Sequence, residues 1–116
     1  MLIPAAYIRC VLDLYRSIPE TPGRARPADR RLAAALHDRG VALDLVAAAF
    51  VLATARRHYR DPDADALAPV RSLHYYLPVI EELLVDPPPP GYREYLCRRL
   101  APFAPGLVAT IDHQKA

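Results

Sequence analysis

The chain has 116 residues, of which 53 % are hydrophobic and 24 % are charged, and its formal net charge is +2. This balance argues against a disordered tail, a membrane protein and a histone-like polycation, and the length suits a single domain over residues 1 to 116. Two cysteines, Cys10 and Cys97, are too few for a disulfide scaffold or a thiolate zinc site, so we expect both to pack inside helices.

The start of the chain and its apolar stretches indicate where the protein resides. Pro4 and Arg9 interrupt the first eleven residues, so no signal peptide is expected. The longest apolar stretch, Leu45 to Ala55, is well short of the roughly 18 residues that a membrane crossing requires. A cytoplasmic protein that does not enter a membrane is therefore expected.

Two helices are predicted first, over residues 4 to 17 and 27 to 39, with a proline-rich loop between them. The first helix carries apolar residues at helical spacing: Tyr7, Val11, Leu14 and Ile18. Pro27 opens the second helix, Asp29 places negative charge in its first turn, and Gly40 supplies a left-handed stop. The inward residues of the second helix are expected to be Leu32, Ala35 and Leu36.

A third helix is predicted over residues 42 to 59. It is apolar on all sides between Leu45 and Ala55, which is typical of a central helix covered by its neighbours. The short turn before it makes helices two and three either a plain hairpin or a helix-turn-helix. A plain hairpin is favoured, because the third helix begins with Leu43, Asp44 and Leu45 and offers few polar side chains to base edges.

A fourth helical segment is predicted over residues 69 to 85. Its apolar residues recur at helical spacing: Val70, Leu73, Leu77, Ile80 and Leu84. Pro78 lacks the N–H that would bond to the carbonyl of His74, so either the helix kinks or two shorter helices meet. A kink is favoured, because the apolar spacing continues in phase through Pro78.

The last part of the chain is predicted to contain one further helix. The prolines at 87 to 90 form a stiff spacer. A fifth helix over residues 91 to 100 is expected to bury Tyr92, Tyr95 and Leu96, with Phe103 beyond its end, and about ten terminal residues are expected to form a loose tail. The predicted fold class is all-α, a compact bundle of about five helices with a central apolar helix and a proline-kinked fourth helix.

No motif for catalysis or metal binding stands out. The four histidines lack the spacing of zinc ligands: His37, His58, His74 and His113. Glu81 and Glu82 are adjacent and diverge by roughly 100° around a helix, which separates their carboxylates. We expect neither enzymatic activity nor a metal or cofactor.

Arginines form two groups in the sequence. One lies at the entrance to the second helix: Arg24, Arg26, Arg30 and Arg31. The other flanks the loop after the third helix: Arg56, Arg57, Arg60 and Arg71. An antiparallel hairpin would bring both groups to one end of the molecule, where guanidinium groups contact phosphates or acidic partners. The alternative is that Asp61, Asp63 and Asp65 neutralise them internally.

The segment from residue 71 to 80 is the most distinctive part of the chain. Arg71, His74 and Tyr75 share the helix face away from the apolar residues. Arginine beside an exposed aromatic ring is the chemistry that grips the backbone and stacks the bases of single-stranded nucleic acid. The alternative is that Tyr75 and Tyr76 both pack at the edge of the core.

In the same segment three residues separate Tyr75 from Val79 and Ile80. This order approximates the motif of the DnaD-type primosomal and phage replication proteins, which is a tyrosine, three residues, then isoleucine and leucine. Residues 27 to 85 therefore resemble the C-terminal domain of that family. The family contacts DNA through this region, which implies, by resemblance, a DNA-contacting role for Tyr75 and its neighbours.

The leading hypothesis is a small non-enzymatic helical module that binds nucleic acid, as an accessory protein of replication or of a mobile element. The expected partner is DNA, single-stranded DNA included, contacted by both arginine groups together with His74 and Tyr75. Two alternatives stay open. One is a protein–protein adaptor that docks on a partner or on its own copy through helix one or five, and the other is one domain of a longer replication initiator.

Overall fold

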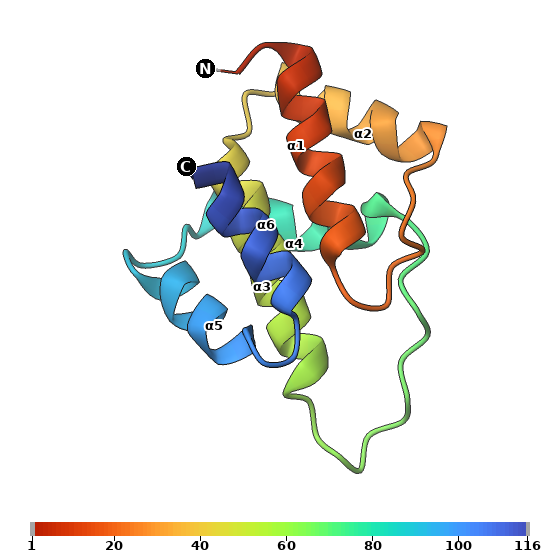
Figure 1. The fold of residues 1–116 in the computed structure, drawn as a ribbon, viewed down its shortest axis with the longest axis vertical. Coiled ribbons are helices and arrows are strands. Elements are labelled where there is room, and N and C mark those ends of the chain that lie inside the picture. Colours follow the sequence, from red (N-terminus) through yellow and green to blue (C-terminus); the bar gives the residue numbers. More distant parts are fainter. Residues whose placement is uncertain (1, 116) are drawn as a thin grey trace.

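The computed structural model describes residues 2–115, which form helices joined by loops (Figure 1). In chain order these are α1 (Pro4–Ser17), α2 (Pro27–Asp38), α3 (Leu43–His58), the 3₁₀ helix η1 (Leu73–Tyr76), α4 (Leu77–Val85), α5 (Tyr92–Leu100) and α6 (Pro105–Lys115). No strand occurs among these described residues, which confirms the all-α class. Within the same range there are six α-helices instead of about five, and no helix is both long and apolar enough to cross a membrane.

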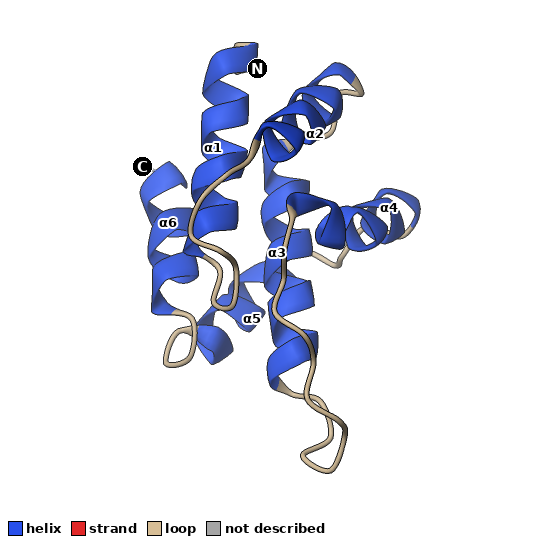
Figure 2. Cartoon of the chain, turned by 90° about the vertical axis from the view of Figure 1, so that its right-hand side faces the viewer, coloured by secondary structure: helices blue, strands red, loops and turns tan. Residues whose placement is uncertain are grey.

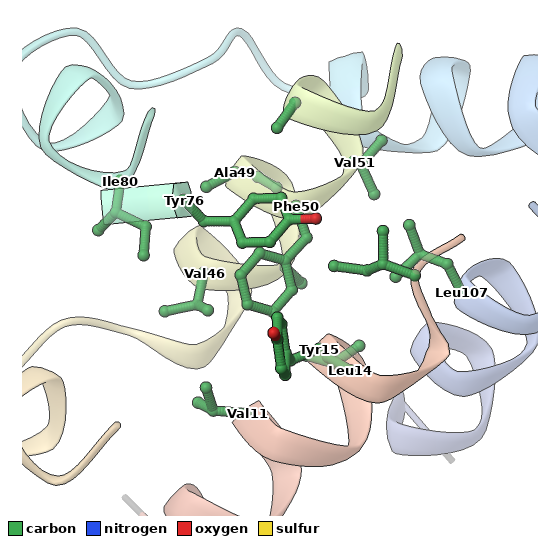
Figure 3. Packing of buried hydrophobic residues seen from close by; sticks show 14 of the residues in the cluster. Val11, Leu14, Tyr15, Val46, Ala49, Phe50, Val51, Tyr76, Ile80 and Leu107 are labelled. Carbon is green, nitrogen blue, oxygen red and sulfur yellow. The ribbon is translucent and has the colours of Figure 1, made fainter. Parts of the chain in front are cut away.

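α3 occupies the centre of the molecule, as its apolar composition predicts. α1, α4 and α5 pack against it, and its residues 46 to 51 are all buried. The ring of Tyr76 lies 4.9 Å from that of Phe50 and 6.2 Å from that of Tyr15, edge to face in both cases (Figure 3). Aromatic rings from α1, η1 and α3 therefore meet in the core.

α1 has the bounds and the buried face that its sequence predicts. The four apolar residues of that face are all buried: Tyr7, Val11, Leu14 and Ile18. The Tyr7 hydroxyl donates a hydrogen bond of 2.8 Å to the carbonyl of Val41, which ties α1 to the turn between α2 and α3. Cys10 on α1 and Cys97 on α5 are both half-buried in helices.

α2 ends before Gly40, which has a φ of 74°, the left-handed conformation expected of a helix stop. Leu32 and Leu36 are buried, as predicted. The prediction for Ala35 is wrong, because this residue is exposed and Ala33 is buried instead. Residues 32, 33 and 36 form one stripe at spacings of three and four, which matches the face that α2 turns toward α1.

The expected kink at Pro78 is wrong, and the alternative of two shorter helices is what the structure has. Residues 69 to 72 are not helical, η1 follows, and α4 begins at Leu77. Pro78 thus lies in the first turn of α4, where its missing N–H needs no partner. The carbonyl of His74 accepts a hydrogen bond from the N–H of Leu77, which closes the tighter 3₁₀ turn.

The 3₁₀ turn also changes which residues of this segment face the core. Residues three apart eclipse each other in a 3₁₀ helix, so Tyr76 follows Leu73 into the core. Ile80 and Leu83 continue this buried face along α4. Leu84 was expected to face inward but is 39 % exposed, because the predicted face assumed helical spacing throughout.

The C-terminal residues form α6, so the expectation of a loose tail is wrong. Leu107 and Ile111 are buried, and α6 packs against α1 and α5. The side-chain amide of Gln114 donates a hydrogen bond of 3.1 Å to the carbonyl of Cys10. Two apolar residues four positions apart are enough to give this helix a face that it can bury.

The prediction for α5 holds only in part. Its two leucines, Leu96 and Leu100, are buried. Tyr92, Tyr95 and Phe103 were expected to be buried but are 37 %, 43 % and 53 % exposed. A nine-residue helix that packs on α3 through one narrow face leaves its other side chains in solvent.

Candidate nucleic-acid interface

The two arginine groups do not meet through a hairpin, because α2 and α3 do not lie side by side. α2 packs mainly against α1 and η1, whereas α3 packs mainly against α1, α4 and α5. Figure 1 shows α2 running crosswise to the upright α3. The arginines at the start of α2 and those at the end of α3 therefore occupy separate parts of the surface.

Two loops lie between the arginines at the start of α2 and those at the end of α3. Residues 18 to 26 and 59 to 72 run along one side of the molecule, the side that faces the viewer in Figure 2. The N–H of Val70 donates a hydrogen bond of 3.1 Å to the carbonyl of Glu20, so the loops touch. The surface between the arginine groups is therefore built by loops, which helix periodicity does not describe.

Asp29 fixes the start of α2 beside η1. Its carboxylate is buried and accepts hydrogen bonds of 2.9 Å from the backbone N–H groups of Arg26 and Leu73. The sequence indicates that this carboxylate lies at the positive end of the α2 dipole. It does not indicate the bond to Leu73. Through this contact the backbone at Arg71, two residues before Leu73, comes close to the first arginine group.

Five predicted site residues are exposed, and their guanidinium groups form no ion pair with a carboxylate among the described residues: Arg24, Arg26, Arg30, Arg31 and Arg71. We call this set the α2 arginine surface. A guanidinium group presents up to five N–H donors and stays charged at any pH of interest. The surface therefore presents guanidinium groups that are not engaged in ion pairs.

Arg57 at the end of α3 is anchored by several contacts and is only 10 % exposed. Its Nε donates a hydrogen bond of 2.9 Å to the carboxylate of Glu20, and its Nη2 donates one of 2.9 Å to the carbonyl of Ala68. Its Nη1 donates one of 3.1 Å to the hydroxyl of Tyr75, and the guanidinium lies 5.4 Å from the centre of that ring. Burial lowers the pKa of Arg57, but the hydrogen bonds to Tyr75 and Glu20 outweigh it and raise the pKa overall. Arg57 therefore holds both loops and the Tyr75 ring in place.

Arg56 and Arg60 also have partners within the chain. Arg56 donates two hydrogen bonds, of 2.9 and 2.6 Å, to the carboxylate of Glu82, and these hold the pKa of Glu82 below its usual range. Arg60 donates to the backbone carbonyl of Asp65. In the described part of the chain no ion pair with arginine is formed by the three predicted neutralising aspartates: Asp61, Asp63 and Asp65. Glu20 and Glu82 take that role instead.

The two tyrosines of η1 have opposite environments. Tyr76 is fully buried, whereas Tyr75 is 42 % exposed, so the core-packing alternative holds for Tyr76 alone. A cleft of about 230 Å³ borders the Tyr75 ring and is also lined by Leu67 and Val79. His74, on the same turn, is exposed. The Tyr75 ring is therefore fixed by Arg57 and still accessible from solvent.

The sequence did not indicate a second exposed aromatic region around α5. Tyr59, Tyr92 and Tyr95 are all exposed there. The guanidinium of Arg99 lies 5.1 Å from the centre of the Tyr59 ring and 5.8 Å from that of Tyr95. The sequence does contain a signal for this exposure. The only aliphatic residues of α5 are two leucines four positions apart, and they define a buried face too narrow to include the tyrosines.

Comparisons of this chain with protein-family models, with curated proteins and with solved structures found no match. In the part of the chain that the structure describes, no group of three or more His, Cys, Asp or Glu side chains could hold a metal ion. The function of the arginine and tyrosine surface is therefore inferred from its own geometry and charge.

Proposed function

We propose that this protein binds single-stranded nucleic acid through the α2 arginine surface and Tyr75. One observation carries the proposal: the accessible phenol ring of Tyr75, fixed by Arg57, lies on η1, which Asp29 ties to the start of α2 and its exposed arginines. Guanidinium groups supply phosphate contacts, and an exposed ring supplies a face on which an unpaired base stacks.

The fold favours a single strand over a duplex. α3, the helix that follows the Gly40 turn, is buried over residues 46 to 51, so it is not placed to enter a major groove as a recognition helix. Stacking on Tyr75 requires a base that is free of its partner strand. The resemblance of residues 27 to 85 to the DnaD-type proteins favours DNA and an accessory role in replication.

A protein adaptor that docks through α1 is less well supported. The apolar face of α1 is already buried against α2, α3 and α6. An amphipathic helix can recruit a partner only with an apolar face that is free.

The proposal predicts steeply salt-dependent binding. Fluorescence anisotropy of a labelled oligothymidylate of about 20 nucleotides, titrated at several salt concentrations, measures it. Changing Arg30 and Arg31 together to glutamine should reduce the salt slope by about 1.4, since each phosphate contact on a single strand contributes about 0.7. Tyr75→Ala should weaken binding about 5- to 150-fold and leave the slope unchanged.

Arg9→Gln is the matched control, because Arg9 is an exposed arginine of α1 outside the α2 arginine surface. It should leave the salt slope nearly unchanged. The proposal is wrong if the wild-type protein does not bind at low salt or binds independently of salt. Light scattering then tests the adaptor alternative, which requires self-association or a protein partner without nucleic-acid binding.

A further inference from the structure

A second surface of arginine and tyrosine lies across the C-terminal end of α3 from Tyr75. We call it the α5 tyrosine patch, and it comprises four residues: Tyr59, Tyr92, Tyr95 and Arg99. All four of the exposed tyrosines lie around the last part of α3, since Tyr75 contacts Arg57 and the other three belong to this patch.

The patch is held in one geometry by its own contacts. Nη1 of Arg99 donates a hydrogen bond of 2.9 Å to the hydroxyl of Tyr95, and the hydroxyl of Tyr59 donates one of 3.2 Å to the carbonyl of Arg99. The ring of Tyr92 stacks beside that of Tyr95, with centres 6.4 Å apart and an angle of 23° between the planes. The rings are therefore preorganised, which lowers the entropic cost of stacking a ligand on them.

The charge of the patch favours an anionic partner. Arg99 contacts tyrosines and, among the described residues, no carboxylate. A second copy of the chain would bring its own Arg99 against this one, and like charges repel across an interface. A strand of nucleic acid offers phosphate to Arg99 and bases to the rings.

The residues of α3 between the two surfaces are basic. Arg56 and Arg57 are successive residues of α3, so their side chains diverge by about 100° around the helix, and Arg57 is the one that contacts Tyr75. The hydrogen bond to Glu82 raises the pKa of Arg56, and Tyr92 adds a smaller effect in the same direction. Arg56 and Arg57, which pair with Glu82 and Glu20, therefore lie between the Tyr75 surface and the α5 tyrosine patch.

We infer that the α5 tyrosine patch is a second stacking platform for the same single strand, reached around the end of α3. This inference rests on the proposed function and adds to it a dependence on strand length. A short strand occupies one platform, whereas a longer strand stacks on both. The longer strand binds more tightly, because its first contact raises the effective concentration of its other bases at the second platform.

The test compares oligothymidylates of about 6 and about 20 nucleotides on the wild-type protein and on the double variant Tyr59→Ala/Tyr95→Ala. The variant should lose about 5-fold or more in affinity for the long strand, and the ratio between long-strand and short-strand affinity should fall toward one. Both tyrosines are more than two-fifths exposed, so circular dichroism should show an unchanged helical spectrum. Tyr95→Phe keeps the ring but removes the hydroxyl that Arg99 bonds to, so it should lose less affinity for the long strand than Tyr95→Ala does.

Ile3→Ala is the control, because Ile3 is an exposed apolar residue before α1, away from α5. If the wild type binds no oligonucleotide, the proposed function fails. If the wild type binds and the double variant keeps its full preference for the long strand, the second platform alone is overturned. It is also overturned if light scattering shows that the wild type self-associates and the double variant does not, while long-strand affinity is unchanged.

Discussion

Three of the seven tyrosines are buried, and their hydroxyl groups differ in whether they find a partner. The Tyr7 hydroxyl bonds to the carbonyl of Val41, whereas those of Tyr15 and Tyr76 are buried without a hydrogen-bond partner among the described residues. A buried polar group without a partner loses its hydration and gains nothing in return. Tyr15 and Tyr76 therefore contribute through ring packing alone.

Phenylalanine should replace Tyr15 or Tyr76 without loss of stability. The expected change in the free energy of unfolding is near zero or stabilising, because the removed hydroxyl makes no hydrogen bond. Tyr7→Phe is the matched comparison and should cost about 1 kcal/mol, since it removes the bond to Val41. Urea denaturation of the three variants measures this. A loss for Tyr15→Phe as large as that for Tyr7→Phe would contradict the account.

At the scale of elements, the short 3₁₀ helix decides how α4 meets the core. η1 places Leu73 and Tyr76 on one side, and α4 then continues with Ile80 and Leu83. A single helix with the predicted spacing would have buried Leu84 instead. One turn of different pitch therefore rotates the face that the rest of the segment presents to α3.

A pair of adjacent leucines tests this rotation. Leu83→Ala should destabilise the protein by about 2–5 kcal/mol, because Leu83 is 4 % exposed and its removal leaves a cavity. Leu84→Ala is the same chemical change at a position that is 39 % exposed, and it should have a much smaller effect. Thermal or urea unfolding measures both. A larger loss at Leu84 would show that the apolar face runs as in one continuous helix.

The whole molecule is as densely folded as a globular domain of its length. Its radius of gyration is 13.6 Å, and a chain of this size is expected to have about 13.4 Å. Burial in this core raises the pKa of Tyr7 to about 12 and also raises the pKa values of Tyr15 and Tyr76 above their ordinary value of 10.0. The folded chain therefore favours the protonated form of these three phenols.

This preference for the protonated form predicts alkaline unfolding. The folded state binds these protons more tightly than the unfolded state, so their contribution to stability is complete below pH 10 and falls as the pH rises through the raised values. Phenolate absorbance and helical circular dichroism, recorded together above pH 10, should show a late ionisation step that coincides with loss of helix. Ionisation of all seven tyrosines with the helices intact would contradict it.

The sequence by itself determined the class of fold and several helix ends. Apolar spacing placed α1 and the central α3, and prolines and glycines marked the ends of α1 and α2, because these signals act over a few neighbouring residues. It also predicted an exposed Tyr75, but the arginine expected beside it was Arg71, and the structure places Arg57 there. Nucleic-acid binding by these residues stays a prediction.

Only the tertiary structure decided what depends on contacts between distant segments. Asp29 bonds to the backbone of Leu73, Glu20 pairs with Arg57, and α6 covers α1. The same holds for the exposed tyrosines around α5, since a tyrosine suits both a core edge and a wet surface. Local spacing fixes which side chains share a face, but which faces find a partner depends on how the helices and loops pack.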